Sequence, residues 1–245
     1  MSNYVLLNNI EHKNLKVISD FSLRYGDNVS AAITFPQEFR TIQAQFPIFF
    51  SKNSETGKFF PVALLGLTEG ENLFLTDKGW DTNYVPISIR RNPFLIGFQR
   101  TQVDGELKNN MVVYVDMDSP RISESEGESV FLPHGGNTPY LESVATMLEY
   151  INIGDQTSVD FIETLSKYEL IEPISMDIEL KNGERNRLVG YYTVNEEKLA
   201  CLSAEVLAEL HSKSYLIYIY MVLASMSNME KLIERVEARI AGVSA

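Results

Sequence analysis

Cysteine and long apolar runs are scarce in this 245-residue sequence. The one cysteine, Cys201, excludes an internal disulfide, and its neighbours 198–202 resemble a helix face that enters the core. The longest apolar run, 215–224, is shorter than the about 20 residues that a membrane-spanning helix needs. Residues 1–9 lack the basic start and the apolar stretch of a secretory signal. We therefore expect a soluble, cytoplasmic protein without membrane insertion.

Positive charge is also scarce. Lysine and arginine total 21, against 33 aspartate and glutamate residues, so the formal net charge is −12. A surface of this sign repels phosphate backbones and anionic lipid headgroups, which argues against nucleic acids and membrane surfaces as partners. The hydrophobic content of 44% is sufficient for a sizeable core and argues against disorder of the whole chain.

The common motifs of catalysis, nucleotide binding and metal binding are missing. The chain contains no Gly-x-Ser-x-Gly, no Gly-x-x-x-x-Gly-Lys-Ser/Thr and no Gly-x-Gly-x-x-Gly. The histidines His12, His134 and His211 form no His-x-x-x-His pair, none has an acidic residue two positions further on, and Cys-x-x-Cys is absent. We therefore expect no metal and no cofactor, and the residues do not decide whether the protein is an enzyme.

The first half of the chain has the pattern of short strands. One helix is expected over about 36–45, where Phe39, Ile42 and Phe46 recur at helical spacing. No linker or repeat divides the chain, so we expect a single domain over residues 1–245. Turn-bounded runs rich in β-branched and aromatic residues predict an antiparallel or mixed sheet. These runs are 47–51, 59–65, 72–76, 85–90, 94–98 and 111–116.

The second half is richer in helical patterns. Apolar stripes predict helices from Thr138 to about Ile151 and over about 157–168, with Gly154-Asp155 as the break between them. Strand-like residues 174–181 and 187–193 flank Asn182-Gly183, which predicts a β-hairpin with a type I′ turn.

The C-terminal residues complete the predicted α+β fold. Ser203 is expected to cap a helix, residues 215–223 have the composition of a buried strand, and Ser227 with Glu230 forms a capping box for the last helix. The fold class is thus α+β, with an antiparallel or mixed sheet in the first half, and helices, a β-hairpin and a buried strand in the second. The last helix and the apolar run before it could also form the seam of a homodimer.

Two carboxylates and a glycine-rich loop are the main candidates for a binding site. Strand alternation places Asp116 and Asp118 on one face at a strand end, where they can bind a cation, orient a basic ligand or act in acid–base chemistry. In segment 131–140, a Gly-Gly loop leads into a helix N-terminus, whose backbone N–H groups suit a carboxylate or phosphate. The predicted cleft is lined by Asp116, Asp118, Arg121, His134, Gly135, Gly136, Asn137 and Tyr140.

Structural interpretations of the same residues stay open. Asp118-Ser119-Pro120 is a favourable turn, Arg121 could pair with Asp116 or Asp118, and Thr138 could simply cap its helix. A second candidate site contains Asn72 and Trp80 in a segment with glycines at 70 and 79. An aromatic residue there is either a recognition platform or a lid on the core.

The chain resembles the SapC family nearly from end to end. The resemblance is carried by strings such as Phe35-Pro36-Gln37-Glu38-Phe39-Arg40, Pro93-Phe94-Leu95-Ile96-Gly97-Phe98, residues 131–141 (FLPHGGNTPYL) and residues 188–199 (LVGYYTVNEEKL). It implies a Gram-negative bacterial accessory protein, since the family is named after surface-layer loci and its genes occur beside those of halogenase-like proteins, cupin-like proteins and TonB-dependent receptors. It implies no catalytic residues.

Three functions are consistent with these observations. The first is a non-enzymatic accessory protein that binds a peptide, a small ligand or a partner protein, such as a halogenase-like or TonB-receptor-associated one, in the predicted cleft. The second is a metal-dependent enzyme in which Asp116, Asp118 and His134 converge and the Gly135-Gly136 amides bind an anionic substrate. The third is a surface-layer structural component, which would require secretion.

Overall fold

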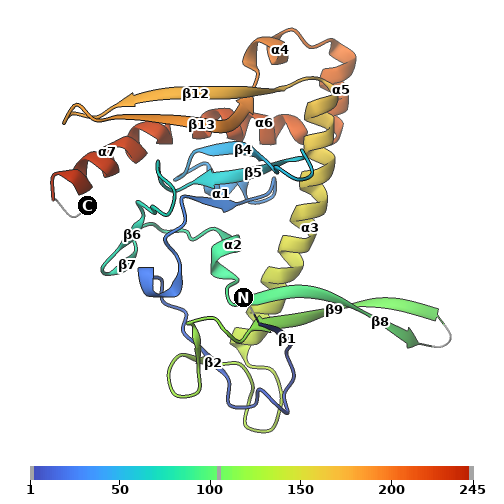
Figure 1. Ribbon diagram of the computed structural model, residues 1–245. Coiled ribbons are helices and arrows are strands. Elements are labelled where there is room, and N and C mark those ends of the chain that lie inside the picture. Colours follow the sequence, from blue (N-terminus) through green and yellow to red (C-terminus); the bar gives the residue numbers. More distant parts are fainter. Residues whose placement is uncertain (1–2, 104–105, 243–245) are drawn as a thin grey trace. The chain divides into compact units, whose positions relative to one another are not determined.

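The computed structural model describes residues 3–103 and 106–242, with side chains described outside 101–108. Its helices and antiparallel sheets confirm the predicted α+β class (Figure 1). The chain divides into two compact units: one contains residues up to Asp27 and Ile87–Ile153, and the other contains Asn28–Pro86 and the residues from Gly154 onward. The single domain stays a prediction.

The first unit is built on a three-stranded antiparallel sheet in the order β1-β9-β8. Its buried core residues come from β8 and β9, from one face of the long helix α3, and from the chain at β2 and directly after β11; they include Val17, Phe94, Val115, Val130 and Leu141. The strands β8 and β9 confirm the strands predicted at 94–98 and 111–116. The elements of this unit are β1 (Tyr4–Leu6), β2 (Lys16–Val17), η1 (Leu23–Tyr25), α2 (Ile87–Arg90), β8 (Phe94–Val103), β9 (Glu106–Asp116), β10 (Ile122–Ser123), β11 (Glu128–Ser129) and the first part of α3 (Pro139–Lys167).

The second unit contains a five-stranded antiparallel sheet in the order β12-β13-β4-β5-β3. Phe161 of α3 meets Phe39 and Tyr215 edge to face, with ring centroids 6.1 and 5.2 Å apart, so aromatic packing joins the helices of this unit. Its elements are β3 (Ala31–Ile33), α1 (Phe39–Ile42), β4 (Ile48–Lys52), β5 (Phe59–Leu64), β6 (Leu75–Thr76), β7 (Gly79–Trp80), the last part of α3, β12 (Ile171–Glu179), β13 (Arg185–Val194), α4 (Glu196–Ala200), α5 (Ala204–Ser212), α6 (Tyr215–Ser225) and α7 (Asn228–Ile240).

The predicted break at Gly154-Asp155 is wrong, because the helix α3 continues without interruption from Pro139 to Lys167. Gly154 is buried, and an added Cβ would lie 2.4 Å from the Phe35 ring. Glycine is therefore needed there for close packing and not to end a helix. At the start of α3, Thr138 caps as predicted: its Oγ1 accepts a hydrogen bond from Leu141 N at 3.2 Å.

The strand predicted over residues 215–223 is wrong, since these residues form helix α6. Tyr215, Ile219 and Val222 are buried at helical spacing, whereas Ile217 and Tyr220 are exposed. Apolar residues occupy both faces, so the run contained no period from which to distinguish a helix from a strand. The homodimer seam stays a prediction.

Shorter segments also differ from expectation. Residues 85–90 do not form a strand: Ile87–Arg90 is the one-turn helix α2, and the preceding Pro86 suits a first turn. Within 72–76 only Leu75–Thr76 is a strand, and within 36–45 only Phe39–Ile42 is α-helical. The free thiol of Cys201 is exposed at the end of α4, so its predicted place in the core is wrong.

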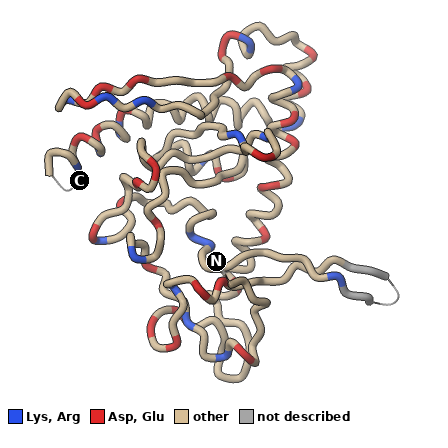
Figure 2. The backbone as a smooth tube through the Cα atoms, in the orientation of Figure 1, with Lys and Arg blue, Asp and Glu red and all other residues tan. Residues whose placement is uncertain are grey.

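The predicted β-hairpin is confirmed as β12 and β13, but its turn is of another type. Gly183 has a φ of 86°, Gly183 N donates to Leu180 O at 2.9 Å, and Leu180 N donates to Glu184 O at 2.8 Å. A type I′ turn needs a positive φ at both central residues, Asn182 and Gly183, but in this turn only Gly183 has one. Both signs of charge line this hairpin and α7 (Figure 2), which protects the edge strand β12 from pairing with other chains.

The caps of the last helices differ from each other. Ser203 caps α5 as predicted, since its side chain accepts a hydrogen bond from Val206 N. The helix α7 is confirmed, but Ser227 makes no side-chain cap and instead donates its hydroxyl to Ala224 O at 3.0 Å. The capping box is therefore wrong, although the apolar stripe placed the helix correctly.

Candidate functional site

The end of β9 fixes the carboxylate of Asp116. Its Oδ1 accepts hydrogen bonds from Asn3 N at 2.9 Å and from Asp118 N at 3.1 Å. The second bond closes a local turn over residues 116–118. Within the described residues, Asp116 Oδ2 and both carboxylate oxygens of Asp118 have no hydrogen-bond partner. These three oxygens are therefore available to a ligand.

A cavity of about 530 Å³ opens beside these carboxylates, and we call it the acidic cavity. Its volume lies in the range of about 300–1,000 Å³ that is typical of small-molecule sites. Tyr4 reaches it because β1 pairs with β9, which places Tyr4 opposite Asp116. The lining residues are Tyr4, Tyr25, Gly26, Arg91, Asn92, Pro93, Asp116, Asp118, Ser119 and Pro120.

Arg91 brings a guanidinium group to the same cavity. Its Nη1 donates a hydrogen bond to Phe94 O at 2.8 Å, and it forms no ion pair with a carboxylate of the described residues. Burial lowers the pKa of Arg91, while its interaction with Tyr4 acts in the opposite direction. The acidic cavity thus presents groups of both charges to a ligand.

Arg121 does not pair with Asp116 or Asp118. It is only 2% exposed, and its Nη2 donates to both carboxylate oxygens of Asp27 at 2.7 Å. Its Nη1 donates to Ile18 O at 3.0 Å and to Asp20 O at 2.6 Å. The side chain therefore binds the chain segment 18–27 to the rest of the first unit.

The loop that contains His134 is closed by its own backbone. Gly135 N donates to Leu132 O at 2.9 Å, Leu132 N donates to Gly136 O at 2.7 Å, and Asn137 forms a bridge with Phe131. The Gly135 amide is thus occupied, and Asn9 Nδ2 donates to Gly135 O at 2.7 Å from outside the loop. The exposed His134 is not part of the lining of the acidic cavity.

The residues around His134 border another cavity of about 690 Å³, together with Lys13 and Lys16. The carboxylates and the histidine loop, which the sequence predicted as one cleft, thus contribute to different cavities. In the part of the chain that the structure describes, no three histidine, cysteine, aspartate or glutamate side chains form a group that could bind a metal ion. This holds for Asp116, Asp118 and His134, so the arrangement required for a metal-dependent enzyme is not formed.

Arg121 and Tyr140, both predicted site residues, do share a cavity of about 380 Å³. Asn92 lines this cavity as well as the acidic cavity. Burial raises the pKa of Tyr140 to about 12, against the opposing effect of the Arg121 charge, so its hydroxyl stays protonated at neutral pH. The other lining residues are Ser19, Phe21, Arg90, Ser143, Val144 and Met147.

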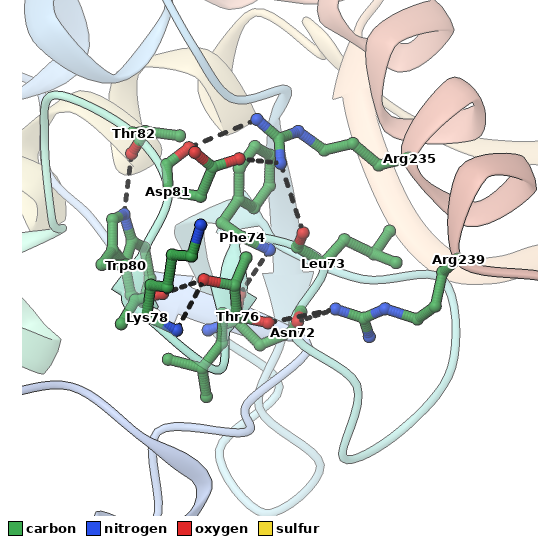
Figure 3. A network of polar contacts seen from close by, with 12 residues as sticks. Asn72, Leu73, Phe74, Thr76, Lys78, Trp80, Asp81, Thr82, Arg235 and Arg239 are labelled. Carbon is green, nitrogen blue, oxygen red and sulfur yellow. Dashed lines mark hydrogen bonds and ion pairs between the residues drawn. The ribbon is translucent and has the colours of Figure 1, made fainter. Parts of the chain in front are cut away.

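Asn72 and Trp80 belong to the second unit and lie in a polar network (Figure 3). Trp80 Nε1 donates to Thr82 Oγ1 at 2.7 Å and to Tyr84 O at 3.0 Å. Asn72 is buried, and its Oδ1 accepts a hydrogen bond from Phe74 N at 3.0 Å. These polar atoms stabilise the loop itself. The Trp80 side chain also lines a cavity of about 490 Å³ with Asp81, Lys231 and Arg235.

Arg91, Asn92, Tyr4 and Tyr25 are cavity residues that sequence reasoning did not identify. Tyr4 and Tyr25 lie far from Asp116 in the chain, and only the pairing of β1 with β9 brings Tyr4 next to it. The available signal was the string Arg90-Arg91-Asn92-Pro93, in which two cations precede a strand.

The fold and these cavities define an α+β protein with ligand-sized polar cavities at the end of a strand. A family model described as SapC matches residues 7–232, which is most of the chain, so the protein belongs to the SapC family. No curated protein and no solved structure matches the chain. No helix within residues 3–103 and 106–242 is long and apolar enough to span a membrane.

Proposed function

We propose that this SapC family protein is a non-enzymatic accessory protein whose acidic cavity binds the basic group of a peptide or small molecule. One observation carries the proposal. Asp116 and Asp118 line the same ligand-sized cavity, and three of their carboxylate oxygens have no partner within the described residues. Carboxylates in this arrangement attract a cation that can donate hydrogen bonds.

A primary ammonium group suits this cavity. It has three donors, which the free oxygens of Asp116 and Asp118 can accept, and its charge is compatible with the aromatic face of Tyr4. The Tyr25 ring already stacks with the guanidinium groups of Arg24 and Arg121. The hydrogen bonds from Asn3 N and Asp118 N fix the Asp116 carboxylate before a ligand arrives, which reduces the entropy lost on binding.

Binding explains these groups better than catalysis does. A nucleophile needs a neighbouring base that activates it. Ser119 lines the cavity, but its Oγ accepts a hydrogen bond from Arg121 N at 3.3 Å, and no histidine is part of the lining. Asp116 and Asp118 therefore have the position of recognition groups.

The proposal is tested with two probes that differ in one charge, N-acetyl-lysine amide and N-acetyl-norleucine amide, titrated by calorimetry. We expect saturable binding of the lysine probe only. Asp116→Asn keeps an acceptor oxygen but removes the charge, and we expect it to weaken binding about tenfold, since hydrogen bonds to charged groups contribute about 1.5–3 kcal/mol. The exposed Asp118 should contribute less, about fivefold for Asp118→Asn.

The matched control is Asp155→Asn, an exposed aspartate on α3 that lines none of the cavities described above. It should leave binding of the lysine probe unchanged. Equal affinity for both probes, or unchanged affinity in Asp116→Asn, would contradict the proposal.

We also propose that the protein acts in the cytoplasm. The support is the exposed free thiol of Cys201, since a lone thiol of this kind persists in a reducing compartment. Cell fractionation tests this, and recovery from the outer membrane or the surface layer would contradict it. Copurification from the native host tests the partner proteins that the family resemblance suggests, halogenase-like and TonB-receptor-associated ones.

A further inference from the structure

The cavity shared by Arg121 and Tyr140, which we call the Arg121–Tyr140 cavity, has a lining without carboxylates. Aspartate and glutamate outnumber lysine and arginine in the chain by 33 to 21, yet the charged residues of this lining are Arg90 and Arg121. Asn92, Ser19, Ser143 and Tyr140 add further polar side chains. All of them except Ser143, whose Oγ already donates to Tyr140 O at 2.8 Å, can donate a hydrogen bond to an anion.

Arg121 has one buried donor that the protein does not use. Asp27 and the carbonyls of Ile18 and Asp20 occupy its two terminal nitrogens. Its Nε is buried and has no partner within the described residues. Buried donors are nearly always paired, because an unpaired one loses its hydration without compensation, so this Nε points to an acceptor that the chain does not supply.

The Tyr140 hydroxyl is a second donor without a partner in the described part of the chain. Burial raises its pKa to about 12, so the hydroxyl stays a donor well above neutral pH. The Tyr140 ring lies 6.2 Å from the Phe94 ring, and the residue belongs to the first turn of α3, so core packing fixes the position of the hydroxyl.

The other side of the cavity is apolar. Phe21, Val144 and Met147 complete the lining, and a volume of about 380 Å³ suits a small ring or a short aliphatic chain. We propose that the Arg121–Tyr140 cavity binds an oxyanion, a carboxylate or a phosphate, carried by a small apolar group. Arg90 supplies the positive charge, because Asp27 balances that of Arg121, and Arg121 Nε supplies a hydrogen bond. The apolar residues contact the rest of the ligand.

This site does not depend on the function proposed for the acidic cavity. Asn92 lines both cavities, so a ligand with a basic group and an oxyanion could contact both. The probes nevertheless separate them: the lysine probe tests Asp116 and Asp118, and the anions below test the Arg121–Tyr140 cavity. One site can fail while the other is confirmed.

The first experiment titrates the full chain with benzoate, with its uncharged analogue benzamide and with inorganic phosphate, followed by nuclear magnetic resonance. We expect saturable benzoate binding with shifts at Ser143, Val144 and Met147, and at least tenfold weaker binding of benzamide. Phosphate that binds at the same residues more tightly than benzoate would also support an oxyanion site and assign it to phosphates. No saturable shift with either anion would overturn the proposal.

A variant then tests the contribution of the Tyr140 hydroxyl. Tyr140→Phe removes the hydroxyl and keeps the ring, so we expect about tenfold weaker anion binding. Tyr220→Phe on α6 is the control, because this exposed tyrosine lies in the second unit and should change nothing. If Tyr140→Phe binds as the unaltered protein does, the role of the hydroxyl is refuted.

Met147 offers a matched pair that leaves the buried arginine in place. Met147→Gln and Met147→Glu have similar size, but the second adds a negative charge to the lining. A like charge in partly buried surroundings should weaken anion binding at least tenfold relative to Met147→Gln. Equal anion affinity in the two variants would contradict an oxyanion in this cavity.

Discussion

Removing the Asp27 carboxylate should destabilise the first unit strongly. Asp27 is 1% exposed, and its oxygens accept hydrogen bonds from Arg121 Nη2, at 2.7 Å each, and from Ser22 N at 2.8 Å. Asp27→Asn leaves the Arg121 guanidinium buried without its counter-charge. Breaking a buried ion pair in this way costs about 3–5 kcal/mol in the free energy of unfolding.

The assay must report on the first unit. Trp80, the sole tryptophan, belongs to the second unit, so its fluorescence is the wrong probe. Hydrogen exchange at amides of β9 and of the first half of α3, measured against urea concentration, gives the unfolding free energy of the first unit. The control is Asp177→Asn, which lies in the second unit and is therefore followed by exchange at amides of β13; it breaks the exposed Arg187–Asp177 pair and should cost less than about 1 kcal/mol.

A double variant separates charge from packing. Asp27→Leu with Arg121→Met removes both charges and retains apolar volume, so it should be more stable than Asp27→Leu alone by at least about 1 kcal/mol. If Asp27→Asn costs no more than Asp177→Asn, or if the double variant is the least stable of all, the uncompensated charge is not the cause of the instability.

Two further predictions concern the second unit. Gly154→Ala should lower the unfolding free energy of the second unit by about 1–3 kcal/mol, because the added methyl meets the Phe35 ring. The control is Gly136→Ala in the first unit, whose methyl only touches Leu132 at 3.4 Å and should have little effect on that unit. Urea denaturation checks both variants, and equal costs would refute the packing argument. The Tyr168 hydroxyl, with Lys213, lowers the pKa of Glu209 from 4.5 to about 2, so the stability from this contact is complete above about pH 4.5 and is lost as the pH falls toward 2. Tyr168→Phe should therefore weaken the pH dependence of stability between these values, and an unchanged dependence would refute the assignment.

Local patterns decided how much of the fold could be predicted. Alternation and turn residues were sufficient for the β12–β13 hairpin and for β9, and the apolar stripes located α5 and α7. Where apolar residues occupied both faces, as in 215–223, the period was lost and the helix α6 was missed. The break at Gly154 was wrong because the reason for that glycine is the ring of Phe35, more than a hundred positions earlier in the chain.

The residues of the candidate site were likewise predictable only where a local sequence pattern indicated them. Asp116 and Asp118 were found because they lie near the end of one predicted strand, and their cavity is formed there. Strand alternation was the wrong reason for Asp118, because β9 ends at Asp116 and Asp118 lies in the turn that follows. Arg121 was assigned the wrong partner, since its counter-ion Asp27 is 94 positions away and no local pattern indicates such a pair. The same holds for Tyr4, which reaches the acidic cavity only through the pairing of β1 with β9.

The chain passes from one unit to the other after Asp27, after Pro86 and within α3 after Ile153, so each unit consists of separate stretches of sequence. Cutting the chain after Pro86 would divide the residues of both units between the two products, whereas a cut after Asp27 would divide only the first unit and a cut after Ile153 only the second. The helix α3 is one uninterrupted backbone connection, since its first part belongs to one unit and its last part to the other. Because each unit is discontinuous in sequence, neither can be produced by trimming the ends of the chain without keeping residues of the other.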